Sequence, residues 1–347
     1  MKLFSKTINY LWIILLVYSC QQNKQIKFTS FPESYELRGV KVEDSILFQT
    51  GIIDIYDSLL ILNSAAGMEK CIHIFNKNSF KYILSTGDIG RGPREIKIMG
   101  LGTIDKSKEI IWYRDLGKMV LWEFNINEAL MNPTYFPENF VALPEDKFFI
   151  HFLPELNNLF SFADPDQKIL ISFFNHKGEV VDSLNIPNRL NIYKKLDENT
   201  RKHTSTYLYQ RHPSKEQYVI AYRMADVIAI IDSRGHVISK SWGPGKILEN
   251  PKFGETNYLQ TYKYLKVSNR YIYGLYLGLK RFEKKENEVL PSYPKIMHIF
   301  DWKGQPVAKI NLEYPASTFD IDIEKNRIIT FSPVTGGFIY YDLPKFK

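Results

Sequence analysis

The stretch Ile296–Ile310, "IMHIFDWKGQPVAKI", contains the pattern that decides the fold. An apolar run ends at Asp301, a turn with Gly304 follows, and a second apolar run begins after Pro306. An Asp at the start of a tight turn accepts hydrogen bonds from the backbone beyond it, and Gly adopts the positive φ that such turns need. The stretch therefore predicts two antiparallel strands joined by a hairpin.

The same pattern occurs six times along the chain. Each copy is an apolar, aromatic-rich run that ends in Asn or Asp: "CIHIFN" at Asn76, "MVLWEFN" at Asn125, "ILISFFN" at Asn175, "VIAIID" at Asp232, "IMHIFD" at Asp301 and "GFIYYD" at Asp342. A second apolar run precedes each copy: "LLILN", "EIIWY", "KFFIHF", "QYVIAY", "RYIYGLY" and "RIITFS". With one further strand on either side, the repeating unit has four strands and about 50 residues, which is typical of a propeller blade. The sequence predicts an all-β, six-bladed β-propeller of four-stranded antiparallel blades.

The ends of the repeat predict how the ring closes. The sixth unit stops at Asp342 without an outer strand, and the segment "SYELRGVKVEDSILF", residues 34–48, precedes the first unit. We expect this N-terminal strand to complete the last blade, because the pairing removes two open sheet edges. Residues 34–347 then form a single propeller domain.

The first 20 residues have the pattern of a secretion signal. Lys2 and Lys6 precede the apolar run Leu11–Val17, which is shorter than the roughly 20 residues that a spanning helix needs. Residues 1–19 are therefore interpreted as a signal peptide, with an ordinary signal peptide or an uncleaved anchor helix as alternatives to the lipoprotein signal described next.

Leu16, Ser19 and Cys20 are arranged as in a bacterial lipobox. This resemblance predicts an acylated Cys20 and a lipidated tether over residues 20–33. Since "QQNKQ" after Cys20 has no acidic residue, unlike the surface-export signals of some lipoproteins, we expect an outer-membrane lipoprotein of the cell envelope that faces the periplasm.

Three stretches resemble a known family. They are "HIFDWKGQPVAKINLEYPASTFDID" (298–322), "NRIITFSPVTGGFIYYDL" (326–343) and "GDIGRGPREI" (87–96). They are similar to the closing blades and the first interblade loop of the TolB-like six-bladed propeller lipoproteins. The resemblance extends over nearly the whole mature chain and implies the fold. It implies no activity, because that group is largely without assigned function.

The glycine-rich stretch "STGDIGRGPREI", residues 85–96, raises the possibility of a phosphate site. Gly87 and Gly92 have the spacing of a P-loop, but Pro93 and Arg94 stand where that motif has Lys and Ser or Thr. The stretch is therefore interpreted as a turn between blades. Its Arg91 and Arg94 suit a carboxylate or phosphate.

Composition excludes several classes of function. The net charge is +7, with Lys, Arg, Asp and Glu interspersed, so no basic stripe for nucleic acid is present. There are only two Cys, and Cys71 in "CIHIF" is interpreted as a buried thiol. The seven His form no HExxH pair and no G-x-S-x-G motif occurs. We therefore predict no catalytic residues, no metal and no cofactor.

Loop lengths indicate where a partner binds. The first-to-second and third-to-fourth strand connections are expected to be short, and the other two sets long, so that one face carries the long loops. Candidate binding residues on that face are Arg91, Arg94, Arg114, Asp115, Arg223 and Asp226. The leading hypothesis is a membrane-anchored, non-catalytic binding or scaffold module for a protein, peptide or glycan partner. The alternative is a propeller enzyme, such as a lyase, lactonase or sugar-acting hydrolase, with its site at the channel mouth.

Overall fold

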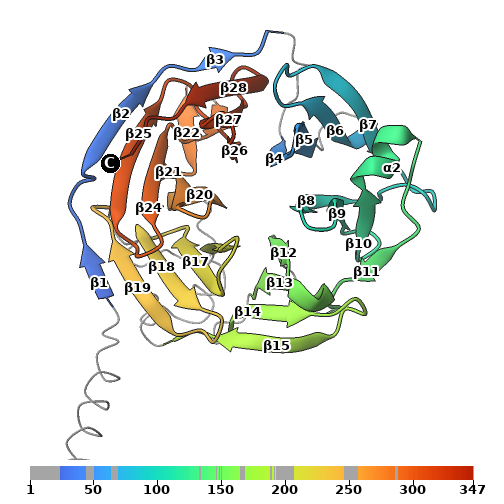
Figure 1. Cartoon of the computed structure of the whole chain (residues 1–347), viewed down its shortest axis with the longest axis horizontal. Helices are drawn as coiled ribbons and strands as arrows, with labels where there is room; N and C mark the ends of the chain where they lie inside the picture. Colours follow the sequence, from blue (N-terminus) through green and yellow to red (C-terminus); the bar gives the residue numbers. More distant parts are fainter. Residues whose placement is uncertain are drawn as a thin grey trace, which may run out of the picture.

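The chain forms a six-bladed β-propeller, shown down its axis in the computed structural model of Figure 1. The structure describes residues 24–346 except 44–50, 64–68, 133, 146, 148, 150, 165–168, 188–189, 191, 193–206, 246–256 and 286–287. The signal peptide over residues 1–19 and Cys20 lie outside the described residues. The predicted fold class is confirmed.

Each blade is an antiparallel sheet whose strands follow one another from the channel outward. Blades 1 to 3 consist of β4 (Ile52–Tyr56), β5 (Leu59–Asn63), β6 (Lys70–Asn76) and β7 (Tyr82–Asp88); β8 (Met99–Asp105), β9 (Ile110–Asp115), β10 (Val120–Asn125) and β11 (Phe140–Ala142); and β12 (Phe152–Pro154), β13 (Phe160–Ala163), β14 (Ile169–Phe174) and β15 (Val180–Asn185). Blades 4 to 6 consist of β16 (Tyr207–Arg211), β17 (Gln217–Tyr222), β18 (Val227–Asp232) and β19 (Val237–Trp242); β20 (Leu259–Val267), β21 (Tyr271–Lys280), β24 (Ile296–Asp301) and β25 (Pro306–Leu312); and β26 (Thr318–Asp322), β27 (Arg327–Ser332) and β28 (Gly337–Asp342). A separate hairpin of β22 (Phe282–Lys285) and β23 (Glu288–Pro291) extends from blade 5.

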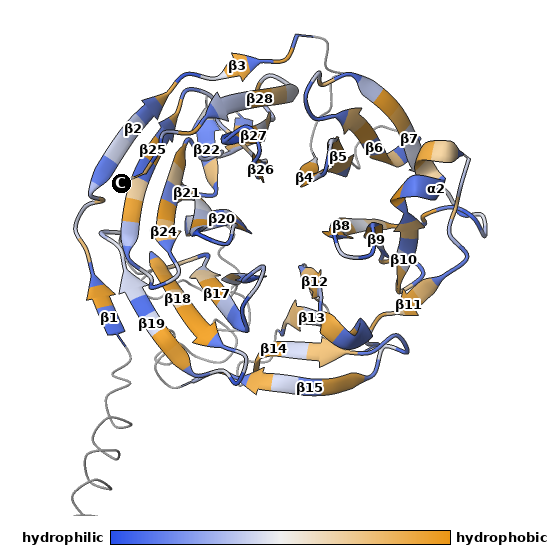
Figure 2. Cartoon of the chain, viewed as in Figure 1, coloured by the Kyte–Doolittle hydropathy of each residue, from blue (hydrophilic) through white to orange (hydrophobic). Residues whose placement is uncertain are grey.

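The apolar runs are the middle strands of the blades, and both of their faces are covered. Every residue of β5 is buried, as are the five residues Cys71–Phe75 within β6. Such strands read as continuous apolar runs because neighbouring blades pack against both sides. Figure 2 shows this apolar colouring within the blades, while the outer strands alternate with polar residues.

The predicted turn chemistry is present after Asp301. Its Oδ1 accepts hydrogen bonds from the backbone N–H groups of Lys303 and Gln305, both at 2.8 Å. Gly304 has φ 77°, and a Cβ there would lie 2.7 Å from the Ser239 hydroxyl oxygen. Any other residue at this position would be strained and would collide with blade 4, so this turn also fixes the spacing between blades 4 and 5.

The ring closes as expected. The short strand β3 (Val40–Lys41) pairs antiparallel with β28 and gives blade 6 its outer strand. On the inner side, the Asp320 carboxylate accepts a hydrogen bond from Ile55 N at 2.7 Å, which ties β26 to β4 of blade 1.

The N-terminal segment does more than close one blade. The strand β2 (Glu33–Leu37) pairs in parallel with β25, and β1 (Lys24–Lys27) pairs in parallel with β19. The segment therefore runs along the outside of blades 4, 5 and 6 (Figure 1). Phe28 and Phe31 pack edge-on against Phe300, with ring centroids 5.8 and 5.5 Å apart.

This placement corrects the expectation that residues 20–33 form a free tether. From Lys24 onward the segment is part of the propeller, because two parallel strand pairings and the two half-buried Phe rings hold it. This pairing was not predicted, because nothing in the sequences of the outer strands β19 and β25 indicates that a further strand pairs with them.

Blades 2 and 3 differ from the prediction in two places. The connection between β10 and β11, expected to be short, contains a helix, α2 (Ile126–Met131), capped by Asn125, whose side chain accepts from Glu128 N. In blade 3, the run "KFFIHF" was expected to be the second strand, but that strand is β13, and the run largely precedes β12. Both runs are apolar, and pattern alone does not decide which one pairs.

Candidate functional site

The strand order gives the ring two distinct faces. The loop face carries the connections that follow the second and fourth strands of each blade, and the short-turn face carries the connections that follow the first and third. The candidate residues from the sequence all lie in connections of the loop face or at the strand ends that lead into them. The structure shows that they divide into four kinds.

Asp115 and Asp226 organise the loops themselves. The Asp115 carboxylate is fully buried and accepts hydrogen bonds from the backbone N–H groups of Lys97, Ile98, Gly117 and Lys118 at 2.9–3.1 Å. Asp226 accepts from Gly245 N at 3.0 Å and from the Tyr262 hydroxyl at 3.1 Å. A buried carboxylate in such a position substitutes for the missing backbone acceptors of a loop. The carboxylates of Asp115 and Asp226 therefore stabilise loops of this chain through hydrogen bonds.

Arg114 is also buried. Its guanidinium donates to the Phe149 carbonyl and lies 5.5 Å from the centre of that ring. Burial lowers the pKa of Arg114 to about 10, and its Nε has no hydrogen-bond partner among the described residues. Arg114 links blade 2 to the segment before blade 3 and keeps a positive charge near the channel.

Arg91 and Arg94 are exposed in the glycine-rich connection between blades 1 and 2. The backbone of this connection has internal partners. Gly92 N donates to the Glu95 carboxylate at 2.6 Å, and the Lys118 ammonium donates to the carbonyls of Gly92, Pro93 and Glu95 at 2.7–3.0 Å. The position that a phosphate would take beside Gly92 N is thus held by Glu95. The stretch has the contacts of an interblade turn, with two arginines projecting from it.

Arg223 belongs to a cationic cluster that the sequence pattern did not reveal. The cluster consists of Arg223, Lys263 and Arg281, all partly buried on the loop face of blades 4 and 5. The Arg223 carbonyl accepts from Thr261 N at 2.8 Å, and Arg281 N donates to the Tyr258 carbonyl at 3.1 Å. Arg223 is therefore attached to β20, the strand that carries Lys263, and Arg281 to the residue directly before that strand.

The charges of both arginines act on Lys263. Burial is the main cause that lowers the pKa of Lys263, and the positive charges of Arg223 and Arg281 add to it. Together they lower this pKa to about 8. Aromatic rings support the cations, since Lys263 lies 4.5 Å from the centre of the Tyr293 ring and Arg281 lies 5.0 Å from that of Tyr258. One sequence signal was available, because Arg281 directly follows β21 just as Arg223 directly follows β17.

Within the channel, charge is paired. The Lys266 ammonium on β20 contacts Asp54 on β4 and lies 3.5 Å from Asp320 on β26. Burial lowers the pKa of Lys266, but the attraction of Asp320 and Asp54 outweighs it and raises that pKa well above its usual value. These three residues connect blades 5, 1 and 6 around the axis.

His73, His298 and Cys71 have the surroundings of packed side chains. His298 stacks on Tyr276 at 4.1 Å between ring centroids, and burial followed by the charge of Lys309 lowers its pKa to about 3. Burial lowers the pKa of His73 to about 4 and raises that of the Cys71 thiol to about 12. Among the described residues, no group of three His, Cys, Asp or Glu side chains has a metal-binding arrangement.

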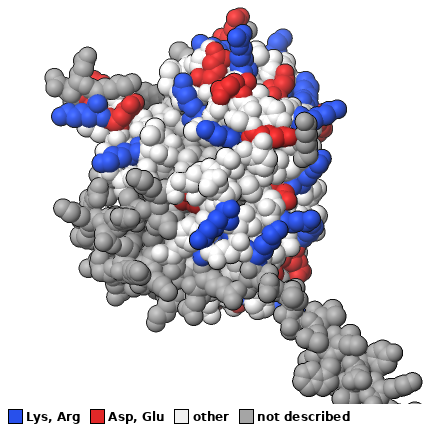
Figure 3. All heavy atoms as spheres, turned by 90° about the vertical axis from the view of Figure 1, so that its left-hand side faces the viewer, with Lys and Arg blue, Asp and Glu red and all other residues white. Residues whose placement is uncertain are grey.

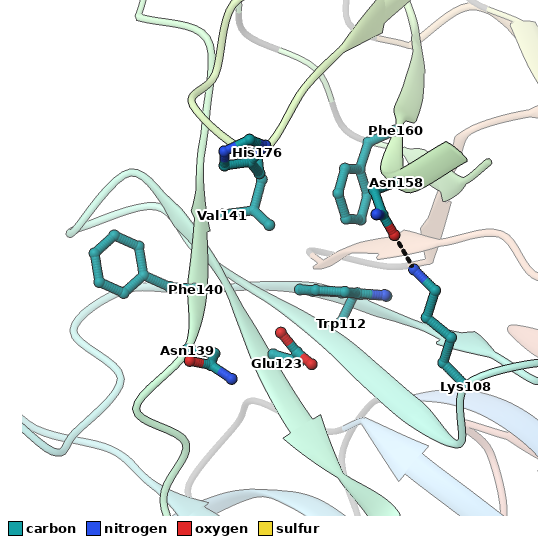
Figure 4. A pocket seen from close by; sticks show the side chains of 9 residues that line it. All are labelled: Lys108, Trp112, Glu123, Asn139, Phe140, Val141, Asn158, Phe160 and His176. Atoms are coloured by element: carbon teal, nitrogen blue, oxygen red, sulfur yellow. Dashed lines mark hydrogen bonds between the residues drawn. The ribbon is translucent and has the colours of Figure 1, made fainter. Parts of the chain in front are cut away.

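Among the described residues, pockets lie between neighbouring blades on the short-turn face. One of about 540 Å³, between blades 4 and 5, is rimmed by four cations: Lys24, Lys215, Arg270 and Lys303. The other, of about 440 Å³, lies between blades 2 and 3 and is lined by aromatic, amide and charged side chains (Figure 4). No helix in the part of the chain that the structure describes has the length and apolar character of a membrane span.

Comparison with known families agrees with this architecture. The family described as TolB-like 6-blade propeller-like matches residues 30–324. The chain belongs to this family. No curated protein matches it in sequence.

Solved structures of two bacterial proteins share the fold. A member of the DUF4221 family from Bacteroides vulgatus superposes with a TM-score of 0.62 at 9% identity, covering 89% of this chain and 95% of that protein. A putative exported protein from Bacteroides fragilis superposes with a TM-score of 0.59 at 12% identity, covering 92% and 99% of the two chains. At these identities the likeness is one of fold alone.

Proposed function

We propose that this protein is a non-catalytic binding module of the cell envelope that holds an acidic protein, peptide or glycan partner on the loop face. The observation that carries the proposal is the cluster of Arg223, Lys263 and Arg281. Three cationic side chains on one part of the loop face create a positive potential there, which attracts an anionic partner. Arginine also offers paired donors to a carboxylate.

A lipid anchor at Cys20 would orient this face. The strand β19 runs from the short-turn face toward the loop face, and β1 runs parallel to it with Lys24 beside Ser239. The chain therefore enters the propeller at the short-turn face. Cys20 is four residues earlier, a reach of at most about 14 Å. An acylated Cys20 would hold the short-turn face toward the bilayer and direct the loop face away from it.

The basic edge at this entry point fits the same orientation. Lys24, Lys215, Arg270 and Lys303 surround one pocket there, and Lys and Arg near an anionic membrane each contribute about 1 kcal/mol to its attraction. Figure 3, which views the left-hand side of Figure 1, shows Lys and Arg side chains interspersed with Asp and Glu over this side of the molecule. The Bacteroides fragilis protein of the same fold is named as an exported protein, and this description supports an envelope location.

The binding proposal is tested with two labelled probes, a glutamate-rich decapeptide and an oligogalacturonate, by fluorescence anisotropy on the purified chain. The triple change Arg223→Met, Lys263→Met and Arg281→Met is expected to weaken binding of at least one probe more than tenfold. The matched control, Lys24→Met, Lys215→Met and Lys303→Met, removes the same charge from the short-turn face and is expected to change affinity less than twofold. Equal losses in both variants, or no binding of either probe, would contradict the proposal.

The lipid anchor is tested separately by metabolic labelling with an alkyne fatty acid. The wild-type chain is expected to incorporate the label and to fractionate with membranes, and Cys20→Ala to do neither. Label in Cys20→Ala would refute acylation at this residue without affecting the test of the loop face.

A further inference from the structure

The groove between blades 4 and 5 on the short-turn face carries an excess of positive charge. Its volume of about 540 Å³ is within the range of small-molecule sites. Four cations line it together with one carboxylate, that of Asp301, which leaves three positive charges in excess. The pocket between blades 2 and 3, in contrast, has one Lys and one Glu in its lining, whose charges balance.

The four cations come from both walls of the groove. Lys24 at the start of β1 and Lys215 in the turn before β17 belong to blade 4, and Arg270 before β21 and Lys303 before β25 belong to blade 5. All four are exposed, and none forms an ion pair with another residue in the described part of the chain. Their charges are therefore open to an anion from solution.

The sheet register directs side chains of both walls into this one space. Ser239 faces blade 5, since a Cβ on Gly304 would lie 2.7 Å from its hydroxyl oxygen. Lys24 is paired in register with Ser239 in the neighbouring parallel strand, so it points to the same side of the sheet. From blade 5, Trp302 packs with Val219 of blade 4 in the cluster between the two blades. Lys24 and Trp302 thus face each other across the groove.

The walls are held in place by hydrogen bonds. The Trp302 indole N–H donates to the Ser268 carbonyl at 2.9 Å, and its ring lies 4.3 Å from the His212 ring, between centroids. The Ser241 hydroxyl donates to the Gly304 carbonyl and so joins blade 4 to the turn of blade 5. A groove fixed in this way needs little ordering when a ligand enters.

The charge and size of the groove restrict the ligand. An excess of three positive charges disfavours a cation, and a single carboxylate neutralises only one of them. A phosphate monoester carries about 1.5 to 2 negative charges at pH 7 and three acceptor oxygens. Arginine offers paired N–H donors to such a group, and lysine binds it as a point charge. The remaining volume suits an organic substituent, for which Trp302 and the half-buried Ile238 form an apolar wall.

We propose that this groove binds a phosphate monoester, with the phosphate among the four cations and the organic substituent against Ile238 and Trp302. A soluble ester and a lipid headgroup present the same phosphate group, and the two arms of the test distinguish them. The site goes beyond the proposed function, because it lies on the opposite face from the cluster of Arg223, Lys263 and Arg281. Its test uses other probes and does not depend on a lipid anchor.

The soluble source is tested by phosphorus NMR line broadening of glycerol 3-phosphate on the full chain with Cys20→Ala, in which no acyl group at residue 20 contributes. Broadening is expected. The double change Lys215→Met and Lys303→Met removes one cation from each wall and is expected to weaken binding about tenfold. The matched control, Lys106→Met and Lys325→Met, removes two exposed cations from turns of blades 2 and 6 on the same face. It is expected to change affinity less than twofold.

The lipid source is tested by co-sedimentation of the same proteins with phosphatidylcholine vesicles. The vesicles contain either phosphatidic acid, a phosphate monoester, or phosphatidylglycerol, a diester, at equal surface charge. A preference for phosphatidic acid that is lost with Lys215→Met and Lys303→Met would support the proposal and identify a headgroup as the source. Broadening of glycerol 3-phosphate without this preference would support it and identify a soluble ester.

Lys303→Glu covers the case in which the double variant does not fold. It places a second carboxylate in the groove and is expected to abolish binding of glycerol 3-phosphate. Succinate serves as the carboxylate probe. Neither broadening nor a preference for phosphatidic acid, equal losses in the groove variants and the control, or succinate binding as tight as that of glycerol 3-phosphate would each overturn the proposal.

Discussion

At the junction of blades 6 and 1, on the short-turn face, Lys77 and Arg327 both contact Asp322, at 3.2 and 2.9 Å. On the loop face of blades 4 and 5, Lys263 instead lies beside two arginines. Both regions bury charged side chains, but the first brings charges of both signs into contact, whereas the three residues named in the second are all cations. The comparison separates an ion-pair network that joins two blades from the cluster for which we propose an anionic partner.

The paired region is closely packed. The Arg327 guanidinium donates to the Lys77 carbonyl at 2.8 Å and lies 5.3 and 5.0 Å from the centres of the Phe80 and Tyr340 rings. Burial raises the pKa of Asp322, but hydrogen bonds from Arg327 and Lys77 lower it below its usual value. Since Lys77 belongs to blade 1 and the other two residues to blade 6, this network supports the closure of the ring.

The largest effect is expected from breaking this network. Asp322→Asn leaves Lys77 and Arg327 without their shared countercharge and is expected to lower the free energy of unfolding by about 3–5 kcal/mol. Urea denaturation followed by circular dichroism measures it. Glu324→Gln, which removes an exposed partner of the same Lys77, is the control and is expected to cost less than about 1 kcal/mol. Similar losses in both variants would refute the role of the buried network.

The second largest effect is expected from raising the pH, which removes the positive charge of Lys263. Lys263 has a folded pKa of about 8, below its unfolded value, so it loses its proton first in the folded state. Between pH 8 and 10 the unfolded chain holds the extra proton, and stability therefore rises with pH through this group. Affinity for the anionic probes is expected to fall over the same step, about fivefold, or roughly 1 kcal/mol.

The measurement is anisotropy with the decapeptide at pH 7.0 and 9.5, on wild type and Lys263→Met. The fall should be present in wild type and nearly absent in the variant. An equal fall in both would show that other groups titrate in this range.

The smallest effect is expected from Lys263→Met on stability. The variant loses the hydrogen bond from the ammonium to the Ser292 carbonyl, 2.8 Å long, but also loses the repulsion from two arginines. We expect its free energy of unfolding at pH 7 to stay within about 1 kcal/mol of wild type, as measured by urea denaturation. A loss near that of Asp322→Asn would erase the distinction between the two regions.

The sequence nominated the loop face and Arg223 for the proposed site, but not the contacts that the residues of this face make. The face was predicted from loop lengths, and Arg223 was among the expected residues. Lys263 was not, because it sits in an alternating strand where nothing local distinguishes it. Asp115 and Asp226 were candidate binding residues, and only the folded loops show that backbone amides and a tyrosine hydroxyl donate to their carboxylates.

The sequence by itself determined the ring of six blades, since each apolar run ending in Asn or Asp specifies a strand and a turn through local sterics and hydrogen bonding. It also determined that an N-terminal strand closes blade 6. Only the tertiary structure decided that Lys24–Lys27 and Glu33–Leu37 extend blades 4 and 5, and that Arg223, Lys263 and Arg281 lie together. Pairing at an outer edge and charge proximity depend on residues distant in the chain, and no local pattern encodes them.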